Sequence, residues 1–265
     1  MKKLSRISAL ALALALASPL VAAWLPLGGT RLFAGLAPDY RAAWFASFRQ
    51  LSITLAATLA FASAITIGLG YLSIYSRAAG KAIAGFLEAV ESVPSILIAL
   101  FCYAPVSGYL ARHAAASSSM VSLMVFIFAA TLTTLPEAVR GISIPLGALY
   151  YRKYSLSFRS YGFRKGRILD ILMRSRAMRD ALKRTCSGIL LKTLVLDCSF
   201  GFIIQLGFGS YGTPAHASPG ALIAAHRDAL FQGGAPLLFW LPAIPLATIS
   251  LALLIMLGDK KEYAE

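Results

Sequence analysis

Charged residues and cysteines are scarce in this sequence. Only 14% of the 265 residues are charged, 11 of them Asp or Glu, and the three cysteines show no CxxC or Cys/His spacing. Nothing here suggests a disulfide framework or a cysteine metal site, and no metal site is expected. GxxxxGK[ST] and HExxH are absent as well, so the chain has neither the usual phosphate-binding loop nor a zinc-protease motif. We expect no enzyme activity from this chain alone.

Long apolar runs make up most of the chain. Hydrophobic residues account for 58%, and the mean hydropathy is +0.72, which is more apolar than one soluble core requires. About 20 apolar residues cross a bilayer as a helix. The sequence therefore predicts an all-α polytopic membrane protein with about six transmembrane helices. These lie near residues 7–27, 51–74, 83–110, 120–135, 188–208 and 236–257.

The first run has two interpretations. Lys2, Lys3 and Arg6 precede it, as they would in a cleaved signal peptide. A retained anchor is the alternative, and we favour it because the apolar stretch continues to Leu27 and further spans follow.

The distribution of Lys and Arg predicts the orientation. Twelve of the 25 lie between Arg140 and Arg184, in one segment between apolar runs. Counted on alternating sides, 19 fall on the side of the N-terminus and five on the other, and Lys192 lies within the fifth run. Cytoplasmic loops carry the excess of positive charge, so both termini and a loop over about 140–186 are expected in the cytoplasm. Basic residues gathered in this way do not indicate nucleic-acid binding.

The basic segment is also amphipathic. Ile168, Leu169 and Leu172 recur at helical spacing among basic residues such as Arg164 and Arg167. Three uses remain open: a helix lying on anionic headgroups, a loop that only sets the topology, and a docking helix for a cytoplasmic protein.

Several ionisable residues lie in or beside the apolar runs. Asp197 is near the middle of the fifth run, where a carboxylate should be paired, protonated or in contact with a water-filled path. Lys192, five positions earlier, is too far round the helix for an ideal pair. Glu88 and Glu91 lie near the start of the third run, where a structural role is favoured. Asp197 is therefore the candidate residue of a transport path.

Three stretches resemble a known family. In the first, Glu88 stands six positions before Pro94, which is the proline of the sequence ESVPS at residues 91–95. The second is the basic segment that follows the fourth run. The third contains a Leu-Gly-x-Gly turn and a Gly-Asp near the end of the chain. Over about residues 45–261 the chain resembles the permease subunit of ABC importers of the dipeptide, oligopeptide and nickel branch. The positions that match in the last stretch are Leu206, Gly207, Gly209, Gly258 and Asp259.

The resemblance weakens in the loop that couples such permeases to their motor. With Gly162 as the loop glycine, Leu156, Ser157 and Phe158 stand where the family has Glu-Ala-Ala. This departure leaves an alternative open, a non-transporting membrane scaffold or assembly protein derived from such a permease.

The resemblance implies a MetI-like permease fold, with an anchor and external loop over 1–45 and the permease domain over 46–262. It implies a place in the cell inner membrane, with peptides or nickel as the transported solute. The expected partners are a second permease subunit, cytoplasmic ATPase subunits and an external solute-binding protein. ATP would be bound by the ATPase, and no cofactor by this chain. The coupling loop would contact the ATPase through Ser157, Gly162, Arg164, Ile168, Leu169 and Leu172.

Overall fold

The chain folds into a helical bundle. A computed structural model describes residues 19–21, 23–24, 36–112, 118–203, 218–230 and 235–258, and within these ranges it contains helices and no strand. The long helices are α2 (Pro38–Tyr75), α3 (Arg77–Glu91), α4 (Ser95–Arg112), α5 (Ser118–Tyr150), α8 (Arg176–Ile203) and α10 (Leu237–Gly258). The short ones are α6 (Lys153–Ser160), α7 (Lys165–Met173), α9 (Pro219–Ala225) and the 3-10 helix η3 (Arg227–Leu230).

Four helices, α2, α5, α8 and α10, are long and apolar enough to cross a membrane, and α3 with α4 makes a fifth span if the bent pair is counted as one. The prediction of an all-α, multi-pass membrane protein is confirmed at this level. The predicted number of six spans is not confirmed, since the run predicted at 7–27 lies almost wholly outside the described residues.

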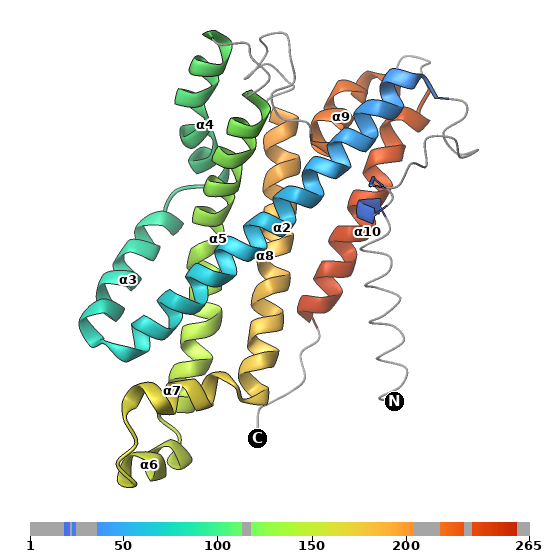
Figure 1. Ribbon diagram of the computed structural model, residues 1–265. Helices are drawn as coiled ribbons and strands as arrows, with labels where there is room; N and C mark the ends of the chain where they lie inside the picture. The colour runs from blue at the N-terminus through green and yellow to red at the C-terminus, as the bar shows by residue number, and fades with distance from the viewer. Residues whose placement is uncertain are drawn as a thin grey trace, which may run out of the picture.

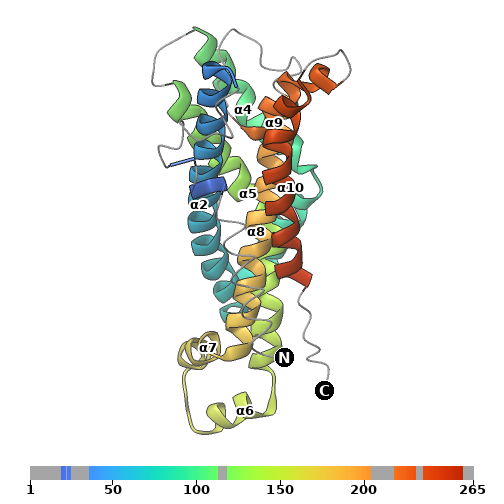
Figure 2. The ribbon, with the colours of Figure 1, turned by 90° about the vertical axis from the view of Figure 1, so that its right-hand side faces the viewer.

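The bundle has two distinct ends. In Figures 1 and 2, α6 and α7 lie beyond one end of the long helices, which we call the loop end, while α9 lies at the opposite end. Figure 1 also shows α2 crossing α5 and α8 diagonally and α7 lying across the end of the bundle.

The third predicted span is not one helix. α3 ends at Glu91, α4 begins at Ser95, and their axes meet at 85°. Pro94 is the local cause, because proline has no N–H to donate and disfavours a helical residue before it. Ser92, Val93 and Pro94 are all exposed on this chain. A break at membrane depth is stable only where protein or water covers its backbone.

The fourth span is longer than predicted. α5 does not end at Leu135 but continues through Pro136 and Pro145 to Tyr150. Neighbouring helices compensate for the hydrogen bond that proline removes from a membrane helix, and α5 packs against α2, α4 and α8. The loop predicted over 140–186 is therefore only residues 151–175. The basic residues that move into helices are Arg140 in α5 and Arg176, Arg179, Lys183 and Arg184 in α8.

Aromatic residues pack together at the end of the bundle opposite the loop end. The Tyr40 hydroxyl at the start of α2 donates to Leu238 O at 2.6 Å, and its ring meets His226 edge-on at 5.0 Å. Trp44 and Phe48, one and two turns along α2, are buried in the same cluster. Burial lowers the pKa of His226, which favours the neutral form of its ring. These contacts join α2, α9 and α10 at this end.

α9 packs against α8 with no room for a side chain at Gly220. A Cβ added there would overlap the carbonyl oxygen of Cys198. We expect Gly220→Ala to destabilise the protein by about 1–3 kcal/mol through overpacking, seen as a lower melting temperature in detergent. The control is Gly68→Ala, since no atom lies within 4 Å of a Cβ at Gly68. Equal melting temperatures for the two variants would contradict the packing of α9 on α8.

Candidate functional site at the loop end

α6 and α7 form a compact hairpin beyond the bundle. The turn between them depends on Gly162, whose φ is +78°, a conformation that strains other residues. Two backbone hydrogen bonds close the turn, from Tyr161 N to Ser157 O and from Phe163 N to Phe158 O, both 3.1 Å. The Gly162 turn therefore fixes how α6 leads into α7.

The apolar face of α7 points into this chain. Ile168, Leu169 and Leu172 are 1%, 0% and 2% exposed. They belong to one cluster with Ile142 and Leu146 of α5. Sequence reasoning identified the apolar face, and in this chain the three side chains pack inward, so any contact of α7 with an ATPase would use other residues. The three side chains hold α7 against the bundle instead.

Polar contacts add to this attachment. Lys165 Nζ donates to Tyr75 O at 2.8 Å, and the Tyr71 hydroxyl donates to Gly166 O at 3.4 Å, so α7 is tied to the end of α2. Arg159 Nη2 donates to Tyr150 O at 3.1 Å, and the guanidinium lies 4.0 Å from the Tyr150 ring centroid. This cation–π contact stabilises the position of Arg159 in addition to the hydrogen bond. The hairpin is thus fixed to α2 and to α5, and the sequence alone did not indicate these anchors.

The opposite surface of the hairpin is exposed. The predicted residues Ser157, Gly162 and Arg164 all lie on it. Tyr161 is 80% exposed, and it lines an open hollow of about 700 Å³ together with Arg164 and Tyr75. Of the six predicted coupling residues, three are therefore on the surface and three support it from within.

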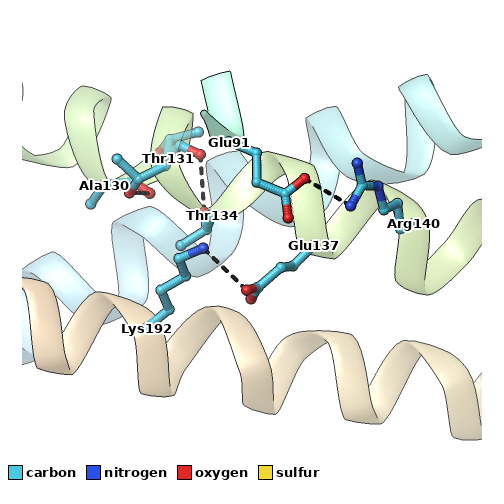
Figure 3. A network of polar contacts seen from close by, with 8 residues as sticks. Glu91, Ala130, Thr131, Thr134, Glu137, Arg140 and Lys192 are labelled. Carbon is cyan, nitrogen blue, oxygen red and sulfur yellow. Dashed lines mark hydrogen bonds and ion pairs between the residues drawn. The ribbon is translucent and has the colours of Figure 1, made fainter. Parts of the chain in front are cut away.

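A second polar feature lies among the helices (Figure 3). Glu137 and Arg140 stand one turn apart on α5. Arg140 Nη1 lies 2.7 Å from Glu91 Oε2 at the end of α3, and Glu137 Oε1 lies 3.4 Å from Lys192 Nζ on α8. α5 is thus ion-paired both to the bent α3–α4 segment and to α8. Sequence reasoning ended the fourth run at 135 and so placed Glu137 and Arg140 at its exit, although their helical spacing was a usable signal.

The Glu137–Lys192 pair lies in the apolar section of the bundle. Ala138, the next residue on α5, packs with Ala62 in the middle of the α2 run and with Ile189 of α8. The pair lines a hollow of about 230 Å³. The Lys192 and Glu137 side chains are 30% and 65% exposed, so both also face space outside the chain. Ionisable residues at such depth are expected to be paired and functional.

Asp197, the predicted path residue, is enclosed by the bundle. It is 1% exposed in α8, between Leu196 and Phe200, which pack with α4 and α5. A path that reached its carboxylate would require these helices to move. No group of three His, Cys, Asp or Glu side chains that could hold a metal ion occurs in the part of the chain that the structure describes. Of the residues that carried the closing resemblance, only Gly258, the last residue of α10, is described.

Comparisons with known proteins assign no family to this chain. No family model matches it, and no curated protein matches its sequence.

Proposed function

We propose that this chain is the transmembrane permease subunit of an ATP-driven importer of the ABC type, which carries peptides or nickel and works with a separate ATPase. The observation that supports this most is the α6–α7 hairpin, which projects from the bundle, exposes Tyr161 and Arg164, and is fixed to the long helices from within. An ATPase that binds the exposed surface would act directly on the membrane helices.

The attachment of α7 makes such coupling mechanically reasonable. Leu169 packs at the ends of α5 and α8, and Lys165 is bonded to the end of α2, so displacement of the hairpin displaces these helices as a rigid body. α5 carries Glu137 and Arg140, whose ion pairs reach α8 and the end of α3. Movement at the loop end would therefore reach the bend between α3 and α4.

The orientation, the membrane and the further partners are also part of the proposal, and they are supported by the distribution of Lys and Arg and by the resemblance in sequence. The loop end and both termini face the cytoplasm, and the membrane is the cell inner membrane. A second permease subunit covers the exposed break at Ser92–Pro94 and encloses the path with this chain. An external binding protein delivers the solute at the opposite end.

A double substitution on the exposed hairpin should release the ATPase. We expect Tyr161→Ala combined with Arg164→Glu to reduce the co-purified ATPase by at least about tenfold, because buried aromatic and Arg side chains dominate binding energies. The measurement is affinity purification of the tagged chain from native membranes, with the ATPase recognised by a GxxxxGK[ST] loop in peptide sequencing. Ile244→Ala, an exposed position on α10, is the matched control.

The result separates two functions. Full recovery of the ATPase with the double variant would contradict docking at the hairpin. If no ATPase accompanies the unaltered chain from membranes that contain one, the non-transporting scaffold is the better interpretation.

A further inference from the structure

A groove leads from an exposed surface of α2 onto α7. It has a volume of about 370 Å³ and is lined by Ile67, Gly68 and Tyr71 of α2, by Asp170 and Met173 of α7, and by Arg174 directly after α7. Gly68 is exposed, and a Cβ added to it would meet no atom within 4 Å. The α2 side of the groove is thus open and apolar.

The α7 side carries charges of both signs, and arginine is in excess along the strip that continues from the groove. The groove shares Asp170 and Arg174 with a hollow of about 250 Å³ that also includes Arg167. That hollow in turn shares Arg167 and Asp170 with the larger hollow containing Arg164. Three arginines and one aspartate therefore line a continuous strip along the exposed face of α7. Among the described residues, no carboxylate lies within ion-pairing distance of these three arginines.

The groove lies at the end of the apolar run of α2. Ile67 and Gly68 lie in the last turns of the apolar run of α2. The rings of Tyr71 and Tyr75 follow at its end, stacked with centroids 6.1 Å apart, in the manner of the aromatic belts at membrane interfaces. The lining thus changes from apolar to cationic along the direction in which a phospholipid changes from acyl chain to phosphate.

We infer that this groove binds one anionic phospholipid of the leaflet at the loop end. An acyl chain lies along Ile67 and Gly68, and the headgroup phosphate faces Arg174 and Arg167. Basic pockets beside membrane helices select anionic headgroups by charge. A soluble protein could contact the arginines but not the half of the groove that lies in the membrane. The inference depends on α2 crossing the membrane and not on the transport function.

The test is lipid binding by the purified full chain in a neutral detergent, counted by native mass spectrometry. Phosphatidylglycerol should bind and phosphatidylcholine with the same acyl chains should not. Arg167→Gln with Arg174→Gln should weaken phosphatidylglycerol binding about 25-fold, from about fivefold for each arginine near a charged surface. Gly68→Trp, which fills the groove without changing any charge, should weaken it about tenfold through lost acyl contacts.

The control is Arg152→Gln, an exposed basic position of the same loop outside the groove, which should bind within twofold of the parent. Equal binding of the two lipids, or an equal loss with Arg152→Gln, would overturn headgroup recognition in the groove. If Gly68→Trp binds phosphatidylglycerol as tightly as the parent does, the acyl chain does not lie along Gly68. Independently of any variant, phosphatidylglycerol with a photoactivatable acyl chain should label residues 67–71 of the unaltered chain, and labelling confined to other segments would refute the site.

Discussion

Leu169→Asp is expected to detach α7 from the bundle. The Leu169 side chain is 0% exposed and surrounded by apolar groups of α5, α7 and α8. A carboxylate there would lose its hydration without gaining a partner, at a cost of at least about 4 kcal/mol. The spans themselves are unchanged, so membrane insertion should persist. Trypsin applied to the loop end in vesicles should cleave the 151–175 segment at least about tenfold faster than in the parent.

Ile171→Asp is the matched control, because Ile171 is on the same helix but 41% exposed. Its protease resistance should stay close to that of the parent. Equal resistance in Leu169→Asp and the parent would contradict the internal packing of α7. If trypsin cleaved both variants equally fast, an aspartate anywhere on α7 would have the same effect, and the buried position of Leu169 would not be the cause.

Lys192→Glu is expected to have the second large effect. The substitution places two carboxylates side by side with Glu137 in the apolar section of the bundle. Removing one partner of a buried ion pair costs about 3–5 kcal/mol, and because this pair is partly exposed we expect about 1–3 kcal/mol. The melting temperature in detergent should fall by several degrees.

Exchanging the two charges provides the control. Lys192→Glu combined with Glu137→Lys restores opposite charges at the same positions, so it should recover most of the lost stability. A double variant as unstable as the single one would show that the 3.4 Å contact is not a stabilising pair.

Periodicity and composition predicted the simplest helices best. The run at 236–257 matches α10 within one residue, because it is uniformly apolar along its length. The run at 120–135 was ended too early because Pro136, Glu137 and Arg140 resemble a helix exit in sequence. They remain helical because partners on α3 and α8 pair with the charges. Those partners are set by tertiary register, which local sequence does not contain.

The hairpin shows the same limit. The spacing of Ile168, Leu169 and Leu172 predicted one apolar face, and that face exists. A pattern of this kind is the same whether the face packs on its own chain or on a partner. The answer came from the position of α7 across the end of α5, where Ile142 and Leu146 complete the cluster. The turn at Gly162 was easier to anticipate, because its positive φ is a local property.

Site-specific photo-cross-linking from Tyr161 in intact cells tests the central claim most directly, that the exposed hairpin binds a separate ATPase. A photoreactive amino acid at Tyr161, 80% exposed, should form an adduct with a protein that carries a GxxxxGK[ST] loop. The same amino acid at Trp240, exposed on α10, should not. Adducts at Tyr161 that contain no such protein, or equal ATPase adducts at both positions, would contradict the account.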